Sequence, residues 1–393
     1  MMEGIITDVE LGDIVKIWVR RGDKKDVLKI PFYPKVYVFE SDFKKFERLF
    51  SDIIVDVDFV LRDFGFCGKR KFAEITVSYS DYLKLRKVYR RLSFKIFHLD
   101  TYEELMLIRA PSLNPVSMRV GRIVEGEYLW GLKSRYPEEL RAIIIMKDDE
   151  GFTVRSYSGD FEERYHSLEE IVTEINPDII FADLNLKVEG ATTANLWTLK
   201  KLGVEGLMEK AYFTFSTPFR VVGLTIGNCV ASRQDYFALK KGMVLPLKEN
   251  QNVEIAKLSD YIYVDASPLV ITPRPGIYYN VASIDFSSMF PHIILKYNIS
   301  YENTSISGIR EMIARGFLPS IIEEPLRRRL YFKRLKSDSA RRRAYILKGM
   351  LVGCYGYAGK NNNRFGNVYV NHWVNRIASE ILSEVILEAK SFG

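Results

Sequence analysis

The stretch 284–300, IDFSSMFPHIILKYNIS, places one carboxylate between an apolar run and a helical pattern. The apolar residues NVASI before Asp285 predict a buried strand, so this side chain is expected where a strand end opens to solvent. Ser287 and Ser288 can accept hydrogen bonds from the first amides of a helix, and Pro291 suits its first turn. Spacing alone leaves two interpretations open: Asp285 caps the helix, or it is a ligand or catalytic group.

A second set of residues suits phosphate binding. Residues 310–364 contain fourteen Lys or Arg and only four acids, whereas the whole chain carries a net charge of +7. Such a concentrated field fits a polyanionic partner, although a pair of solvated helices could carry the same charge. Arg329 and Lys333 lie four residues apart on one helical pattern, and Lys348 and Tyr355 share a face of the next. Three separated cations could together contact a triphosphate.

Two helical patterns must position these cations. The first, at 321–336, contains Pro325, which predicts a kink or a restart of the helix. The second, at 339–352, has Asp338 as its expected cap. A short polar connection joins them, so we expect an antiparallel helical hairpin.

The first 250 residues predict mixed structure. A polar turn within 13–30 predicts a hairpin, and Ser167 with Glu170 has the spacing of a capping box for a helix at 167–175. Apolar alternation predicts strands at 34–39, 72–79, 141–146, 152–157 and 178–183, and a helix at 80–92. Between 200 and 270 the pattern is too weak to place elements.

Composition excludes several classes of protein. The chain has 393 residues, 47% hydrophobic and 27% charged, which is long enough for two or three domains. It has no apolar run long enough to cross a membrane and no signal peptide. Cys67, Cys229 and Cys354 are far apart, which excludes a disulfide framework and predicts small core residues. Two glutamines against 57 Lys and Arg favour a heat-adapted source.

Three motifs resemble those of family B DNA polymerases. DFSSMFPHIILKYNIS at 285–300 is similar to the family's first palm motif, in which Asp-Phe, one residue, Ser-Leu-Tyr-Pro and an Ile-rich helix lead to Asn-Ile-Ser. KGMLVGCYGYAG at 348–359 resembles the fingers motif, and PSIIEEPLRRRLYFK at 319–333 resembles the helix before it. The order and separations of the motifs also agree with the family, and weaker likenesses upstream extend the resemblance over most of the chain.

The resemblance implies a multidomain protein of the α+β and α/β classes. The expected parts are an N-terminal α+β domain at 1–115, an RNase-H-like degenerate exonuclease domain at 116–250, the first part of a polymerase palm at 251–306, a helical-hairpin fingers at 307–356 and a return to the palm at 357–393.

The resemblance also implies a DNA-directed DNA polymerase that uses two Mg²⁺ ions. Asp285 would be catalytic and would bind metal together with the carbonyl of Phe286. Phe290 falls where the family has a Tyr, and its ring would still exclude a 2′-hydroxyl. The expected nucleotide-binding residues are Ser288, Met289, Phe290, Arg329, Lys333, Lys348 and Tyr355. The expected DNA-binding residues are Tyr357, Gly359, Lys360 and Arg364.

The sequence also departs from the family. The family's second catalytic carboxylate comes from an Asp-Thr-Asp hairpin, but Asp338 is the only aspartate after Asp285. We therefore expect a truncated chain or a split polymerase in which a second polypeptide supplies that hairpin and the thumb. Val352 and Gly353 replace the Asn-Ser of the family's fingers motif, which predicts weaker nucleotide binding.

Proofreading is expected to be lost. A two-metal 3′–5′ exonuclease needs several carboxylates, with an Asp-x-Glu pair on its first strand. The corresponding stretch 115–126, PVSMRVGRIVEG, has none in its strand-like part, and Asp183 is the only nearby candidate for a second motif.

The expected partners are primer–template DNA, deoxynucleoside triphosphates and the second polymerase polypeptide, with a sliding clamp left open. We expect an archaeal, cytoplasmic, nucleoid-associated enzyme of DNA replication or repair. The alternative is a catalytically inactive family B relative that acts as a DNA-binding or scaffolding subunit.

Overall fold

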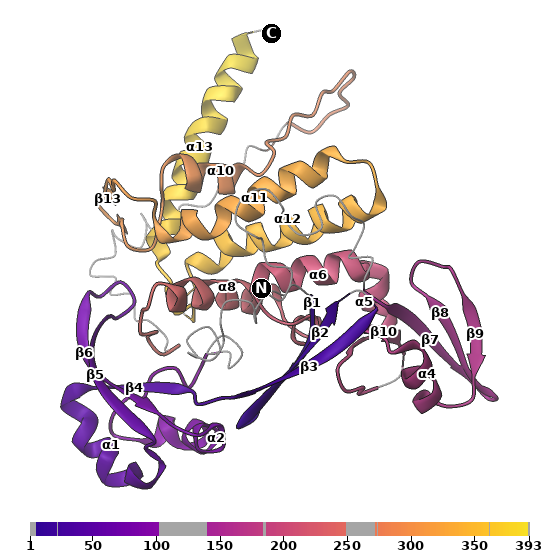
Figure 1. Cartoon of the computed structure of the whole chain (residues 1–393). Coiled ribbons are helices and arrows are strands. Elements are labelled where there is room, and N and C mark those ends of the chain that lie inside the picture. Colours follow the sequence, from indigo (N-terminus) through magenta and orange to yellow (C-terminus); the bar gives the residue numbers. More distant parts are fainter. Residues whose placement is uncertain are drawn as a thin grey trace. The chain divides into compact units, whose positions relative to one another are not determined.

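The computed structural model describes residues 5–21, 23–101, 140–183, 186–248, 272, 274–360 and 362–391 (Figure 1). The fold is a mixed α+β arrangement that divides into two compact units. The first comprises Met1–Leu247 and Arg329–Leu347, and the second comprises Lys248–Arg328 and Lys348–Gly393.

The first unit begins with two three-stranded antiparallel sheets. One has the order β1-β2-β3 and the other the order β4-β6-β5. Their strands are β1 Ile5–Glu10, β2 Ile14–Arg21, β3 Lys24–Pro31, β4 Lys35–Phe39, β5 Asp56–Asp63 and β6 Lys69–Thr76. The accompanying helices are α1 Phe43–Phe50, α2 Tyr79–Val88 and three 3₁₀ turns, Glu40–Asp42, Ser51–Ile53 and Tyr89–Arg91. The predicted hairpin, both strands and the helix in this region are confirmed.

The β4-β6-β5 sheet packs on both faces because its side chains alternate. Val38 and Ala73 face the large core of the unit, whereas Tyr37 and Phe72 face a smaller aromatic cluster that includes Phe97. The side-chain period of two in a strand explains this division. Each fully buried aromatic or aliphatic side chain contributes about 1.5–3 kcal/mol.

A five-stranded mixed sheet follows, with the order β11-β10-β7-β8-β9. Strands β7–β8–β9 are antiparallel, and β10 and β11 run parallel to β7. The strands are β7 Ala142–Asp148, β8 Gly151–Ser156, β9 Glu162–Tyr165, β10 Ile179–Ala182 and β11 Thr192–Ala194. All three strands predicted here are confirmed.

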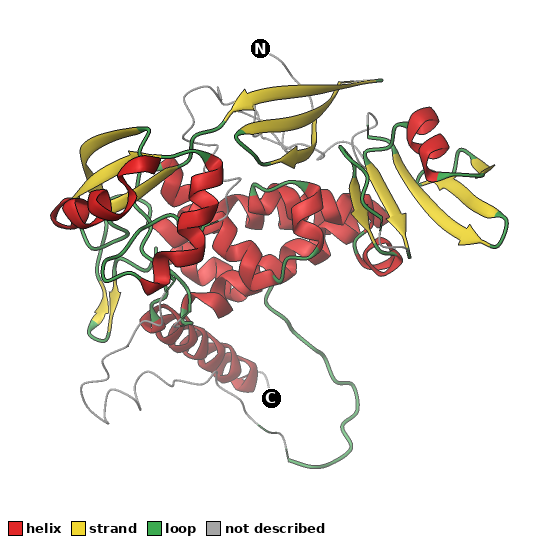
Figure 2. Ribbon diagram, turned by 90° about the horizontal axis from the view of Figure 1, so that it is seen from below, coloured by secondary structure: helices red, strands yellow, loops and turns green. Residues whose placement is uncertain are grey.

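Helix α4, Leu168–Ile175, covers one face of this sheet (Figure 2). Ser167 Oγ accepts a hydrogen bond from the Glu170 N–H at 3.2 Å, as the capping-box spacing predicted. The Glu170 carboxylate reaches back to the N–H of His166 at 2.9 Å, one residue before the cap. Sequence spacing thus located this helix start correctly.

No elements were predicted between 200 and 270. In the described part of this region, up to residue 248, the structure has the end of α5 Leu196–Lys201, then α6 Gly203–Thr214, α7 Pro218–Val222 and α8 Ile226–Lys240. Every residue of α6 is buried, including Glu205, Glu209 and Lys210. The Lys210 amine donates to the Leu224 carbonyl at 2.7 Å, and burial lowers its pKa. On α8, the buried Arg233 guanidinium lies over the rings of three phenylalanines at 4.8–5.3 Å, Phe213, Phe215 and Phe237.

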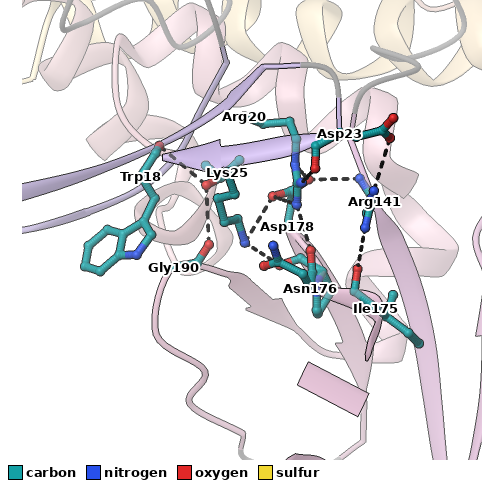
Figure 3. Close-up of polar contacts among 11 residues, drawn as sticks. Trp18, Arg20, Asp23, Lys25, Arg141, Ile175, Asn176, Asp178 and Gly190 are labelled. Atoms are coloured by element: carbon teal, nitrogen blue, oxygen red, sulfur yellow. Dashed lines mark hydrogen bonds and ion pairs between the residues drawn. The ribbon is translucent and has the colours of Figure 1, made fainter. Parts of the chain in front are cut away.

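A buried ion network joins β2 and β3 to the residues directly before β10 (Figure 3). Arg20 binds Asp178 through Nε at 2.9 Å and Nη2 at 3.0 Å, and both side chains are 0% exposed. The Lys25 amine lies 3.1 Å from Asp178, and the Arg141 N–H donates to the same carboxylate at 3.0 Å. Arg20 also donates to the carbonyl of Asn176 at 2.7 Å. Every oxygen of Asp178 is therefore paired, which a buried carboxylate requires.

The second unit is built around helices. It contains α10 Met289–Lys296, the short pair β12 Thr304–Ser305 and β13 Gly308–Ile309, and α13 Val368–Ser391. Helices α11 Phe317–Arg334 and α12 Asp338–Ala358 form the predicted hairpin and contribute to both units (Figure 1).

The structure corrects three details of the sequence interpretation. Helix α11 is continuous through Pro325, so the expected restart is wrong, and the alternative of a kink stays a prediction. Ser337, rather than Asp338, caps α12, because Ser337 Oγ accepts from the Ala340 N–H at 3.3 Å. Cys67 is exposed, whereas the other two cysteines are buried as predicted. Within the described residues, no helix is long and apolar enough to cross a membrane.

Candidate functional site

Asp285 lies in an irregular, exposed segment rather than at the end of a strand. Residues 281–286 have no regular secondary structure, and Ile284 and Phe286 are 82% and 39% exposed. The predicted strand is therefore wrong. A strand needs a neighbour to pair its backbone N–H and C=O groups, and none of the described strands pairs with these residues. The carboxylate of Asp285 is consequently open to solvent.

Helix α10 starts directly after this segment without the expected side-chain cap. Ser288 occupies the N-cap position at φ 60° and ψ 47°, and its side chain accepts no hydrogen bond from the helix. Its carbonyl accepts from the His292 N–H at 3.2 Å instead. Pro291 falls in the first turn, as predicted, and is buried. The interpretation of Ser288 as a side-chain cap is therefore wrong.

The residues that follow α10 hold the start of the hairpin. Ser300 Oγ accepts from the Leu318 N–H at 2.9 Å, and Glu302 accepts from the Phe317 N–H at 2.6 Å. These are first-turn donors that have no partner inside the helix. Gly316 permits the approach, because a Cβ there would lie 2.7 Å from the Cβ of Ser300. The sequence did not predict this role of Ser300 and Glu302. The available signal was their place in a polar turn between two helical patterns.

Phe290 and Tyr355 meet in the second unit. Their ring centroids are 4.4 Å apart with the planes at 40°. The Tyr355 hydroxyl donates to Asn375 Oδ1 of α13 at 2.6 Å. Burial raises the pKa of Tyr355, so its hydroxyl keeps its proton at neutral pH. The sequence predicted the two rings but not Asn375, which gives no local signal.

We expect Asn375→Ala to lower the free energy of unfolding by about 1 kcal/mol, because the Tyr355 hydroxyl loses its acceptor. Tyr355→Phe removes the same hydrogen bond from the other side. In a double-mutant cycle measured by urea denaturation, the double variant should cost little more than either single variant. Fully additive costs would show that the two side chains do not act as a pair.

The predicted phosphate-binding cations differ in exposure. Lys333 and Lys348 are exposed, whereas Arg329 is buried with only 9% of its surface exposed. Arg329 and Lys333 belong to the first unit, and Lys348 belongs to the second, together with Asp285. The structure therefore presents the two lysines to ligands in its present conformation, and it does not present Arg329.

The predicted DNA-binding residues lie at the end of α12 and in the turn after it. Tyr357 donates to the carbonyl of Asn362 at 3.3 Å, and its own carbonyl accepts from the Asn363 side chain at 3.0 Å. Lys360 is exposed, Gly359 is half-buried, and Arg364 is buried at 3% exposure. Of the two cations in this turn, Lys360 is therefore exposed to solvent and Arg364 is not.

Of the candidate exonuclease residues, the structure describes Asp183 alone. Asp183 is exposed at the end of β10, and the stretch 115–126 lies outside the described residues. Within the part of the chain that the structure describes, no group of three or more His, Cys, Asp or Glu side chains is placed to hold a metal ion.

His372 of α13 provides a test of the packing around this site. It is 6% exposed, and burial, assisted by the charge of Arg376, lowers its pKa below the usual value of about 6.5. The unfolded chain therefore binds a proton that the folded chain does not as pH falls below about 6.5. The contribution of neutral His372 to the free energy of unfolding is therefore complete above this pH and declines below it.

We expect His372→Gln to flatten the dependence of the urea midpoint on pH between about 5 and 7, because the titrating group is gone. The exposed His166 offers a matched control, and His166→Gln should leave the slope as it is in the natural protein. An unchanged slope in the His372 variant would contradict the burial argument.

A family model described as DNA polymerase family B matches residues 236–312, which include Asp285 and all of α10. Over these residues the chain is similar to the family B DNA polymerases. DNA polymerase 2 of Saccharolobus solfataricus is 28% identical over 174 residues, which cover 42% of this chain and 27% of that protein. DNA polymerase 1 of Sulfolobus acidocaldarius is 40% identical over 73 residues, which cover 17% of this chain and 8% of that protein. The predicted resemblance to archaeal family B polymerases is confirmed.

A solved structure has the same fold. The family B DNA polymerase from the hyperthermophilic archaeon Pyrobaculum calidifontis aligns with a TM-score of 0.70 at 18% identity. The alignment covers 100% of this chain and 73% of that polymerase. In contrast, the sequence matches to the curated archaeal polymerases named above span about a quarter or less of their length.

Proposed function

We propose that this chain is the part of a family B DNA polymerase that binds primer–template DNA and the incoming deoxynucleoside triphosphate, for deoxynucleotidyl transfer to the primer 3′ end. The observation that carries the proposal is the stretch 285–300. It lies within the matched residues 236–312 and presents an exposed carboxylate, Asp285, directly before a helix. That combination is what the resemblance to the first palm motif implies.

The triphosphate would be held by the cations of the hairpin. Lys333 and Lys348 would contact phosphates as mobile point charges, and Arg329 would add a fork of donors once it is exposed. Ser288 and Met289, at the start of α10, would contact the phosphates near the positive end of the helix. Binding of a triphosphate would therefore rest on both helices of the hairpin and on α10.

The sugar and the base of the nucleotide would contact the aromatic pair Phe290 and Tyr355. The ring of Phe290 would lie under the sugar and exclude a 2′-hydroxyl, and Tyr355 would pack against the nascent base pair. Phe290 differs from the family's Tyr only by the missing hydroxyl group, so selection of deoxyribonucleotides should persist. Tyr357, Gly359 and Lys360 would follow the template backbone.

Mg²⁺ is the cofactor that the resemblance implies, but the described residues do not form a complete site for it. Asp285 and the carbonyl of Phe286 would supply two ligands, whereas a two-metal site needs carboxylates from more than one segment. Asp338, the only later aspartate, pairs with Arg341 on α12. We therefore propose that the second catalytic carboxylate comes from residues outside this sequence, in a second polypeptide or in a continuation of the chain.

The proposed domains keep the boundaries inferred from the sequence. The domain at 116–250 would be a degenerate exonuclease without editing activity. Asp183 alone cannot hold two metal ions. The sheet order β11-β10-β7-β8-β9 supports an RNase-H-like fold for this part.

An inactive DNA-binding or scaffolding subunit is the second candidate. The burial of Arg329 and Arg364 favours it, because neither cation meets solvent in this conformation. A scaffold would bind primer–template DNA through phosphate contacts, with strong dependence on salt and none on nucleotide.

A primer-extension assay separates the two candidates. The chain is incubated with a primed template, Mg²⁺ and all four dNTPs, alone and together with a polypeptide that carries the Asp-Thr-Asp hairpin. Elongation that follows the template sequence supports the polymerase. DNA binding without elongation, at an affinity that the complementary dNTP does not change, supports the scaffold.

A further inference from the structure

The free end of the α11–α12 hairpin is fixed to the first unit by a polar contact that the proposed function does not use. Residues Arg329–Leu347 cluster with Met1–Leu247 rather than with the rest of the two helices. The contact joins α12 to the turn after β8 and to the first turn of α6. We call it the hairpin dock and define it by Tyr157, Gly203, Glu205 and Arg342.

The dock is a small hydrogen-bonded triad. The Tyr157 hydroxyl donates to Glu205 Oε2 at 2.6 Å. Arg342 Nη1 donates to the Tyr157 oxygen and lies 3.4 Å from the same Glu205 oxygen. The side chain of Glu205 is 8% exposed and that of Arg342 is 35% exposed. A charge-assisted contact to a buried carboxylate is stronger than an ion pair between two exposed side chains.

Gly203, the first residue of α6, shows that this helix accommodates the arginine closely. Gly203 has φ +61°, and a Cβ there would lie 2.2 Å from Arg342 Nη1 and 2.5 Å from the Tyr157 hydroxyl. The guanidinium therefore occupies the space that a side chain at 203 would fill. Burial raises the pKa of Tyr157, which keeps its hydroxyl a donor to Glu205.

A cation that the proposed function needs lies in the docked segment and is buried. Arg329 lies in the same segment and is 9% exposed, and Arg343, next to Arg342, is 1% exposed with its guanidinium 5.3 Å from the ring of Phe332. A nucleotide phosphate cannot reach a buried Arg329. Arg329 must become exposed before it can bind a triphosphate.

We propose that the hairpin dock is an autoinhibitory contact, in which Glu205 and Tyr157 hold α12 through Arg342 and keep the hairpin in a state that binds nucleotide weakly. The inference rests on the proposed nucleotide-binding role of the hairpin. It gives the proposed exonuclease-like domain at 116–250 a role without catalysis, because Tyr157 and Glu205 of that domain restrain the hairpin. Nucleotide then binds the undocked conformation, whose population sets the apparent affinity.

The test compares three variants whose charges change in different directions. Arg342→Gln and Glu205→Gln each break the ion pair, but the first removes a positive charge and the second removes a negative one. Arg341→Gln is the matched control, because Arg341 is the adjacent arginine and pairs with Asp338 of its own helix. Long-range attraction alone would make Arg342→Gln weaken nucleotide binding and Glu205→Gln strengthen it.

Two readouts are taken on each full-length variant bound to primer–template DNA. Hydrogen exchange of residues 329–347 reports whether the hairpin end is released. Titration with a fluorescent dATP analogue opposite a templating thymine reports the Kd. We expect both dock variants to exchange faster in this segment and to bind the nucleotide at least about fivefold more tightly. Arg341→Gln should exchange like the natural protein and bind no more tightly than it.

Each other result has a defined meaning. Unchanged exchange in both dock variants overturns the dock. Faster exchange with unchanged or weaker binding overturns autoinhibition, while nucleotide binding by the natural protein still upholds the proposed function. Faster exchange with no nucleotide binding by any variant overturns autoinhibition and the proposed nucleotide site together.

Discussion

Arg20→Met should lower the free energy of unfolding by about 3–5 kcal/mol, because it leaves the carboxylate of Asp178 buried without its bidentate partner. Both side chains are 0% exposed, and their two contacts are 2.9 and 3.0 Å long. Lys25 is a poor substitute, because burial lowers the pKa of its amine. Urea denaturation followed by tryptophan fluorescence, to which Trp18 on the same strand contributes, measures the loss.

The chain offers a matched control for this prediction. Lys16 is also on β2 and also binds an acid of the five-stranded-sheet region, Glu189 at 3.2 Å, but the Lys16 side chain is 37% exposed and that of Glu189 is 69% exposed. Lys16→Met should cost only a small fraction of the Arg20→Met loss, because water solvates the remaining charge. Equal losses would show that burial does not govern this network.

Asp285→Asn should reduce the rate of primer extension by more than about 100-fold, in whichever assembly the natural chain is active. Loss of a residue that only orients a metal ligand already costs about 10–100-fold, and a direct ligand should cost more. The change keeps the size of the side chain and removes its charge. Single-nucleotide incorporation under single-turnover conditions gives the rate.

Asp338→Asn is the control for Asp285→Asn, since it is the only later aspartate and is exposed in an ion pair with Arg341. It should leave the incorporation rate within about twofold of the natural protein, as an exposed surface pair contributes little. A comparable fall in both variants would remove Asp285 from the catalytic centre.

The sequence was most informative where one local rule decided the structure. The turn within 13–30, the capping box at Ser167 and the alternation in β6 and β7 each depend on neighbours in sequence, and each prediction is confirmed. The hairpin of α11 and α12 was also predicted from its pattern. Local geometry and side-chain period determine these elements, so no distant contact was needed to find them.

The sequence was least informative where distant partners decide the structure. Helices α6 and α8 carry buried polar groups such as Glu205, Lys210 and Arg233, which hide the apolar period of each helix. The available signals were Thr217 before α7 and Thr225 before α8, which accept from the amides three residues later at 3.3 Å, whereas α6 has no side-chain cap. The strand expected before Asp285 failed for the opposite reason, because an apolar run alone does not supply a pairing partner.

The site was predicted in part for the same reasons. Motif spacing identified Asp285, Phe290 and Tyr355, and the last two are in contact. It could not show that Arg329 is buried, because burial depends on tertiary packing. Nor could it identify Asn375 or Arg342, whose partners lie 20 and 137–185 residues away in the sequence.

The most direct test of the central claim, that this chain helps to select a deoxynucleotide by template, is equilibrium binding of each dNTP to the chain–primer–template complex. A fluorescent base analogue beside the templating position reports binding without requiring chemistry. We expect the complementary dNTP to bind at least about tenfold more tightly than the three mismatched dNTPs and the complementary ribonucleotide. Equal binding of all these nucleotides would contradict the claim.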